Sequence, residues 1–479
     1  MVEENQSIPS QPIESGEQPP AFSSATPFEV AEAPPPPPPS EEEEEEIIRK
    51  PPLTLFVLIG LVILVGLAVF LLKIFRKPQS PQEANLIYWG LWEEEAVMRP
   101  IIEAFEKEHP KVKISYQKQS PQDYRERVAA AIKKGEGPDI FRFHNTWLPM
   151  LKDYLAPLPK KVISKAEFEK TFYPIVSQDL KWQEQYYGLP LEIDGLALFY
   201  NEKILKAAGF SPPTNWEEFR HQALALTVKD ESGQIITAGA ALGTANNIDH
   251  FADILGLIML QNGVDLKNSN SSEGVEALTF YRLFAEPPQN TWDEALDNSI
   301  LAFAEGKVAM IFAPSWEVFT IKAINPDLTF QTAPVPQLPG VNTTWASYWV
   351  EGVSNKSKFQ DQAWEFLKYL TTKETMTALY TEASKTRLFG EPYSRVDLAS
   401  TLLNQPYLGP FIAQAPNAQS FYLCGRTFDN GLNDRMIKYF EDAVNSLSSG
   451  NSPQTALETV SQGIQQVLKD YGLVTASSP

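Results

Sequence analysis

The sequence predicts an α/β protein of two lobes joined by a hinge, preceded by one transmembrane helix and a disordered N-terminal tail. Three observations support this prediction. The chain has 479 residues, which is more than one hydrophobic core usually serves. Strand-like and helix-like segments alternate from residue 85 onward. Residues 53–72 form an uninterrupted apolar run.

The tail, residues 1–50, is dominated by Pro, Glu, Ser and Gln, so it cannot bury enough apolar surface to fold. Its proline run at 34–39 favours a stiff spacer, with a proline-binding partner as the alternative.

Residues 51–75 predict a membrane anchor. Their central run, "LTLFVLIGLVILVGLAVFLL", is uncharged and would span about 30 Å as a helix, the thickness of a bilayer core. No cleavage site and no lipid-accepting Cys follows it, which favours a retained helix over a removed signal peptide. Lys and Arg flank both ends, so charge does not set the orientation. Residues 76–84 read as a linker.

Composition excludes several classes of function. The formal net charge is -20, and the acidity is spread over the whole chain, which argues against nucleic acid as a partner. The lone Cys424 excludes a disulfide framework and a Cys-based zinc site. The four histidines show no metal-binding spacing and are expected at the surface or in turns. We therefore expect no cofactor and no metal.

The solute-facing edge of the first lobe is predicted from alternating segments. They read strand "NLIYWG", helix "EEEAVMRPIIEAFEKEHP", strand "KVKISYQ", helix "PQDYRERVAAAIKKG" and strand "PDIFRF", which indicates a parallel sheet with right-handed crossovers. Pro100 would mark the start of the first helix or a kink in it. Ligands of open α/β sheets lie beyond the carboxyl ends of the strands, which singles out the loops "WGLW" and "HNTW".

A second α/β set follows the segment "LALFYN". Thr214 and Glu217 fit a capping box before a helix whose apolar residues share one face. The segment "LAFAEGKVAMIFAPSW" predicts a strand at 308–312 and a loop that presents Trp316, and residues 429–471 are mainly helical.

These segments place the folded domain at 85–475. Lobe 1 is predicted at about 85–192 and 335–370, and lobe 2 at about 196–332 and 373–475. Hinges are predicted near 190–196, 332–336 and 370–374.

Aromatic residues gather where the ligand edge is predicted. A single loop Trp covers a core more often than it binds a ligand, but several together at the edges of two lobes favour a sugar, whose C–H faces stack on rings while its hydroxyls take hydrogen bonds. The residues at loops or strand ends are Trp89, Trp92, Trp147, Trp316, Trp345, Trp349 and Tyr348. The other four, Trp182, Trp216, Trp292 and Trp364, are predicted to pack.

Two carboxylates share one face of the apolar stretch "GLPLEIDGLALFYN". Buried carboxylates need a partner, so Glu192 and Asp194 require backbone amides, a basic side chain or a hydroxylated ligand. We expect backbone amides for Glu192 and a ligand for Asp194, which precedes Gly195. A glycoside hydrolase that uses Glu192, Asp194 and Glu351 is the enzyme alternative, although two acids on one strand do not flank a bond from opposite sides.

The sequence resembles the family 1 extracellular solute-binding proteins of ABC importers, the maltose-binding-protein-like group. The matching segments run in order along nearly all of residues 85–475, and the most specific is "YGLPLEIDGLALFYNEKILKAAGFSPPTNWEEF". The resemblance implies two α/β lobes of the type II periplasmic-binding-protein-like fold, which close over a solute and perform no chemistry.

The resemblance also implies ligand-contacting positions. It points to Trp89 and Trp92 in the first loop, Asn145 and Trp147 in the second, Asp194 on the first crossover, and Trp316 as a stacking aromatic. In "WASYWVEGVS" relatives usually have two glycines where this chain has Ser347, Tyr348 and Trp349, which changes the pocket. The terminal helices of relatives often add another ligand contact, for which Phe428, Asp429 and Asn433 are weaker candidates.

The partners implied are a small-molecule carbohydrate, ABC transporter permease subunits and the membrane, which one N-terminal helix enters; the protein is expected to be a monomer. We expect the large C-terminal domain outside the cell and the short tail in the cytoplasm. A sensory or adhesive carbohydrate binder that docks on no permease is the remaining alternative.

Overall fold

The computed structural model describes residues 58, 60–67 and 83–474. Residues 58 and 60–67 are helical, and the described part of the chain contains no helix with both the length and the apolarity that crossing a bilayer requires. The predicted tail, the rest of the predicted anchor and nearly all of the linker lie outside the described residues. Residues 80–479 form one compact unit.

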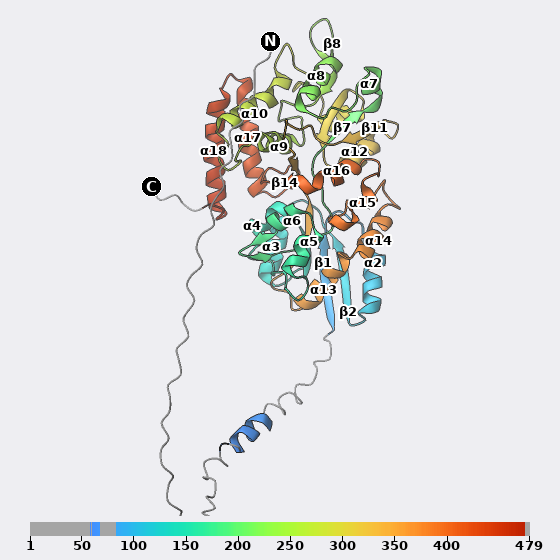
Figure 1. Ribbon diagram of the computed structural model, residues 1–479, viewed down its shortest axis with the longest axis vertical. Coiled ribbons are helices and arrows are strands. Elements are labelled where there is room, and N and C mark those ends of the chain that lie inside the picture. The colour runs from blue at the N-terminus through green and yellow to red at the C-terminus, as the bar shows by residue number, and fades with distance from the viewer. Residues whose placement is uncertain (1–57, 59, 68–82, 475–479) are drawn as a thin grey trace, which may run out of the picture. The chain divides into compact units, whose positions relative to one another are not determined.

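Two separate five-stranded sheets form the centres of the two predicted lobes (Figure 1). The sheet of lobe 1 has the order β2-β1-β3-β13-β6. β1 pairs in parallel with β2 and β3, whereas β13 runs antiparallel to β3 and β6. Its strands are β1 (Ala84–Gly90), β2 (Val112–Lys118), β3 (Ile140–His144), β6 (Leu189–Pro190) and β13 (Trp349–Val353).

The parallel sheet predicted for lobe 1 is therefore correct for the first three strands. It is incomplete because β13 enters from the distant second crossing and reverses the direction of the sheet.

The sheet of lobe 2 has the order β11-β7-β10-β9-β8. β7 is antiparallel to both β10 and β11, and only β9 and β10 pair in parallel. Its strands are β7 (Ala197–Asn201), β8 (Val228–Lys229), β9 (Ile235–Ala240), β10 (Val308–Ala313) and β11 (Phe330–Ala333). Two short pairs complete the strands: β4 (Lys181–Trp182) with β5 (Gln185–Tyr186), and β12 (Thr344–Trp345) with β14 (Ala418–Gln419).

Helices cover both sheets. In chain order the α-helices are α2 (Glu95–Glu108), α3 (Tyr124–Lys134), α4 (Leu148–Leu151), α5 (Lys165–Thr171), α6 (Pro174–Asp179), α7 (Glu202–Ala207), α8 (Trp216–Leu226), α9 (Phe251–Gln261), α10 (Ser272–Arg282), α11 (Ser299–Ala304), α12 (Glu317–Ile324), α13 (Gln360–Leu370), α14 (Lys373–Ala383), α15 (Ala399–Leu402), α16 (Gly409–Gln414), α17 (Leu432–Ser448) and α18 (Pro453–Asp470). The predicted helical end of the chain is confirmed as α17 and α18.

Two local predictions about helix starts are corrected. Pro100 does not mark the start of α2, which begins five residues earlier at Glu95; it lies inside the helix, the position that the alternative prediction of a kink requires. The capping box of α8 is shifted by one residue: Asn215 accepts from the backbone N–H of Glu218, and Glu218 in turn accepts from Thr214. The Asn side chain is the better cap here because it reaches the free N–H of the first turn.

The chain passes between the sheets at three places. Residues 191–196 lead from β6 to β7, and residues 334–348 lead from β11 back to β13. The first two crossings touch, since a Cβ on Gly195 would lie 1.8 Å from the carbonyl oxygen of Trp345.

The third crossing lies further along the chain than predicted. The prediction ended lobe 1 at residue 370 and gave residues from 373 onward to lobe 2, but α14 packs against α2 of lobe 1. Met376 and Leu379 of α14 are buried. The chain returns to lobe 2 only after α14, where Tyr407 contacts Phe330 of β11.

Candidate functional site

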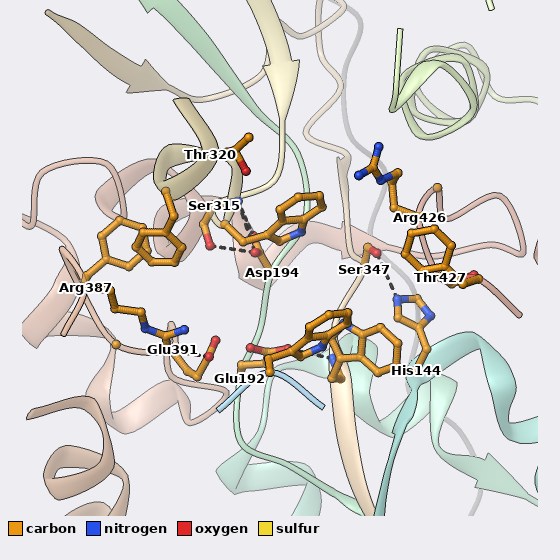
Figure 2. A pocket seen from close by; sticks show the side chains of 18 residues that line it. His144, Glu192, Asp194, Ser315, Thr320, Ser347, Arg387, Glu391, Arg426 and Thr427 are labelled. Atoms are coloured by element: carbon orange, nitrogen blue, oxygen red, sulfur yellow. Dashed lines mark hydrogen bonds and ion pairs between the residues drawn. The ribbon is translucent and has the colours of Figure 1, made fainter. Parts of the chain in front are cut away.

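A cavity of about 360 Å³ lies between the lobes, where both crossings pass (Figure 2). Trp92 and His144 reach it from the carboxyl ends of β1 and β3, which is the edge where open α/β sheets bind ligands. The lining residues are Trp92, His144, Glu192, Asp194, Ser315, Trp316, Phe319, Thr320, Ser347, Trp349, Arg387, Phe389, Gly390, Glu391, Gly425, Arg426, Thr427 and Phe428.

The wall contributed by lobe 1 is a cluster of indole rings. Trp349 packs edge to face against Trp92 and Trp147, with ring centroids 5.3 and 5.2 Å apart. His144 lies 5.1 Å from the Trp349 ring and bonds Thr146 and Ser347 through its two nitrogens. Burial lowers the pKa of His144 to about 3, so this imidazole is neutral at physiological pH.

The wall contributed by lobe 2 presents Trp316, which is 38% exposed at the start of α12. The ring of His250 supports it from behind at 5.5 Å. Phe319 and Phe389 line the same cavity and pack against each other at a tilt, with ring centroids 4.5 Å apart. Aromatic rings therefore line the cavity from both lobes.

The first crossing forms the floor of the cavity. Asp194 accepts hydrogen bonds from Gly195 N–H at 2.8 Å and from the Ser315 hydroxyl at 2.7 Å. Glu192 accepts from the backbone N–H of Trp349 at 3.1 Å. Burial raises the pKa of Asp194 to about 7 and that of Glu192 well above its usual range.

Ionic groups lie beneath and beside this floor. Arg142 is 1% exposed and forms ion pairs of 2.7 Å with Glu93 and 2.6 Å with Glu351. Arg387 pairs with Glu391 at 2.6 Å. Burial raises the pKa of Glu93 to about 7. Burial also acts to raise the pKa of Glu391, but Arg387, hydrogen bonds with Glu192 and Glu93, and Arg142 together hold that pKa low.

The loop 425–428 closes one side of the cavity. Arg426 pairs with Asp249 at 3.0 Å, and Phe428 is 43% exposed. Thr427 is 3% exposed and its hydroxyl has no hydrogen-bond partner; the indole N–H of Trp92 is likewise buried and unpartnered. Buried donors without partners are rare, so these two are available to a ligand.

The structure brings four of the main predicted site residues to this cavity, Trp92, Asp194, Trp316 and Trp349, together with the weaker candidate Phe428. The others lie elsewhere. Trp89 donates to Gln117 on β2 at 3.0 Å, and Trp147 is 1% exposed behind Trp349. The side chain of Trp345 is buried against α9, and its indole N–H donates a hydrogen bond to Asp253 at 2.9 Å.

The remaining predicted residues also have structural partners outside this cavity. Asn145 and Tyr348 both donate to the carboxylate of Asp179, at 2.8 and 2.9 Å. These contacts border a second cavity, of about 330 Å³, which is lined by Asn145 and Asp179 among others. Asp429 is fully buried and accepts from Gly431 and Asn433 at the start of α17.

Several lining residues were not predicted. His144 was expected at the surface or in a turn, but it is 1% exposed, and His250 is 3% exposed. Arg387, Phe389 and Glu391 come from the segment after α14, which carries no periodic pattern. His144 could have been inferred, since it directly precedes Asn145 at the end of β3. The described residues contain no group of three or more His, Cys, Asp or Glu side chains that could hold a metal ion.

Fold and cavity together define a two-lobed α/β binding protein with its candidate site between the lobes. The bacterial extracellular solute-binding protein family matches residues 90–377, more than half of the chain. The chain belongs to this family, and the predicted resemblance is confirmed.

Individual relatives are distant. The multiple sugar-binding protein of Streptococcus mutans serotype c is 25% identical over 346 residues, which are 67% of this chain and 80% of that protein. The cyclic α-maltosyl-1,6-maltose binding protein of Arthrobacter globiformis has a TM-score of 0.66 at 20% identity, covering 81% of this chain and 99% of that one. The sugar-binding protein MalE of Xanthomonas citri has a TM-score of 0.66 at 20% identity, covering 81% and 98%. These two structures support the two-lobed fold.

Proposed function

We propose that this protein captures a saccharide in the cavity between its lobes, performs no chemistry on it, and delivers it to the permease subunits of an ABC transporter. The observation that carries the proposal is the pairing of aromatic rings from both lobes, Trp92 and Trp349 on one side and Trp316 on the other. Rings on opposite walls suit the two faces of a sugar, and the unpartnered donors of Trp92 and Thr427 suit its oxygens.

The relatives support the same class of ligand, because several of them are named for maltodextrins and other sugars. The enzyme alternative is less favoured. Asp194 is held by Ser315 and Gly195, and Asp194 and Glu192 lie two residues apart on the first crossing, so they do not face a bond from opposite sides.

Thermal unfolding of residues 80–479 with a panel of mono- and oligosaccharides, polyols and peptides tests the proposal. A ligand at 100 times its dissociation constant should stabilise the protein by about 2.7 kcal/mol. A shift with another solute class and with no saccharide would remove the carbohydrate assignment. Release of product from a chromogenic glycoside would favour the hydrolase instead.

A pair of matched substitutions separates the cavity from the neighbouring aromatics. Trp316→Ala removes an exposed ring from the cavity wall and should weaken saccharide binding while leaving the unfolding midpoint without ligand nearly unchanged. Trp89→Ala removes an indole that lies outside the cavity, so its affinity should match that of the unsubstituted protein. Equal affinities for both variants would remove Trp316 from the site.

We also propose that residues 53–72 anchor the protein in the cell membrane, with residues 76–479 outside and the N-terminal tail in the cytoplasm. The uncharged run supports the anchor, and capture of an external solute requires this orientation. Protease treatment of intact cells should degrade the large domain. A domain left intact while a surface control protein is cleaved would refute the orientation.

A further inference from the structure

The two carboxylates on the cavity floor have no cationic partner. Asp194 accepts only from Gly195 and Ser315, and Glu192 accepts from the Trp349 amide. Among the described residues, no Lys, Arg or His nitrogen lies within 4.0 Å of either carboxylate, although Glu192 is only 6% exposed.

The arginines near the floor are already engaged. Arg142 is shared by Glu93 and Glu351, and Arg387 is paired with Glu391. Around the floor, five carboxylates therefore face two guanidinium groups, and Glu192 and Asp194 are the two that form no ion pair with either one.

Arg426 does not correct this excess, because it is paired with Asp249 at 3.0 Å. Burying an ionised carboxylate without a counter-charge is costly, so each of the two either keeps a proton or receives a cation. Burial raises the pKa of both groups, and Glu391 raises that of Glu192 further, so without a ligand both carboxyl groups take up a proton more readily than an exposed carboxyl does.

The walls above the floor suit a cation that also carries hydroxyl groups. Trp92, Trp316 and Trp349 line the space, and a desolvated cation is attracted to indole faces. Thr427, 3% exposed with an unpartnered hydroxyl, and the unpartnered Trp92 N–H offer donors to oxygen atoms of the same ligand. Asp194 and Glu192 both lie on the first crossing, and Figure 2 labels both among the side chains that line the cavity.

We propose that the ligand is a saccharide that carries an ammonium group, an amino sugar whose nitrogen is received by Asp194 and Glu192. This inference rests on the proposed saccharide-binding function and narrows it to a cationic class. The ammonium supplies the counter-charge that the chain itself does not provide, and the ring walls and free donors bind the rest of the sugar.

Calorimetric titration of the full chain, purified in detergent at pH 6.5 and low ionic strength, tests the inference. The probes are D-glucosamine, D-glucose and N-acetyl-D-glucosamine, each as the monosaccharide and as its β-1,4-linked disaccharide, and D-glucuronate as the acidic counterpart. Charge-assisted hydrogen bonds are roughly twice as strong as neutral ones. We therefore expect the glucosamine compounds to bind at least about tenfold more tightly than the glucose and N-acetylglucosamine compounds of the same length. Repeating the titration in a buffer of different ionisation enthalpy should reveal proton release with the amino form alone.

The outcomes are distinct. Neutral sugars that bind as tightly as amino sugars, or glucuronate that binds more tightly, would overturn the cationic class and leave the saccharide proposal standing. If a non-saccharide solute binds and none of these sugars does, both proposals fail.

Substitutions of the two floor carboxylates test whether they cause the preference for the amino sugar. Glu192→Gln should reduce the preference for the amino sugar over the neutral sugar about tenfold and abolish part of the proton release. Asp194→Asn should act in the same direction, and its unfolding midpoint shows whether the Ser315 contact survives. Glu106→Gln, which neutralises a carboxylate outside the cavity paired with Lys113, is the control and should retain the full preference. Retention of the preference by both floor variants would overturn the assignment.

Discussion

Replacing Arg142 by Met should unfold the protein more easily, and by an amount that depends on pH. The guanidinium is 1% exposed and holds two carboxylates, Glu93 and Glu351, whose side chains are 2% and 1% exposed. Met fills a similar volume without the charge, so two buried acids lose their only cation within ion-pair distance. Removing one partner of a buried pair costs about 3–5 kcal/mol, and we expect a loss in this range at pH 8.

The pH dependence follows from proton uptake by the two acids. Unfolded glutamate has a pKa of about 4.3, whereas burial already raises the pKa of Glu93 to about 7 and raises that of Glu351 even with Arg142 in place. Without Arg142 both pKa values rise further. Between the unfolded and folded pKa values the folded protein binds more protons, so stability falls as pH rises, by about 1.4 kcal/mol per pH unit for each carboxyl. The destabilisation should therefore be smaller at pH 5 than at pH 8.

Urea unfolding of residues 80–479, followed by tryptophan fluorescence and far-UV circular dichroism at pH 5, 6, 7 and 8, measures this loss. Arg99→Met is the matched control: its pair with Glu95 is 58% and 61% exposed, so it should cost no more than about 0.5 kcal/mol. The double variant Arg142→Met, Glu351→Gln should recover part of the stability. A loss below about 1 kcal/mol at pH 8, or one that grows towards pH 5, would refute the buried-charge reasoning.

Three further outcomes are expected. His144 has a folded pKa of about 3, below its unfolded value, so it contributes a loss of stability as pH falls from about 6.5 towards 3; His144→Gln should flatten that part of a urea-midpoint profile. His250 has a folded pKa of about 9, because Asp253 and Glu317 together outweigh the lowering effect of burial. The stabilisation that His250 contributes is therefore complete below about pH 6.5 and is lost as the pH rises through 9. Midpoints of His250→Gln and the parent protein should therefore converge near pH 10, and a constant gap would contradict the ion pairing. Gly195→Ala should be severely destabilising in thermal unfolding, because the added Cβ would meet a backbone oxygen at 1.8 Å. Gly263→Ala, which has open space around it, should cost only about 1 kcal/mol. Similar costs for the two variants would contradict the close approach of the first two crossings.

The fold could be predicted to a large extent because its signals are local. The alternating segments around Tyr88 and Val112 carry the period and length of strands, and β1 and β2 form as expected. The antiparallel β13 could not be predicted in the same way. Its pairing with β3 joins residues about 200 positions apart, and the direction of such a pairing leaves no trace in either segment.

The candidate site was only partly predictable, for a related reason. Trp92 and Trp316 follow strands, so topology places them at the ligand edge. Trp345 has the same loop context, yet it points into lobe 2 and donates to Asp253. Arg426 and Phe428 line the cavity because the backbone of their loop adopts φ values of 63° and 54°, which non-glycine residues rarely take and which the sequence does not signal.

The two acids of the first crossing link the candidate site to the movement of the lobes, because each acid is hydrogen-bonded to a different lobe. Glu192 accepts from the Trp349 amide in the sheet of lobe 1, and Asp194 accepts from Ser315 at the end of β10 in lobe 2. Only Ile193 separates them, so any rotation of one lobe against the other must be taken up within this short stretch or must break one of the two contacts. A ligand cation that binds both carboxylates would join the lobes through the same two groups. Ligand recognition and lobe closure would then depend on a single pair of side chains, and neutralising either one should weaken both.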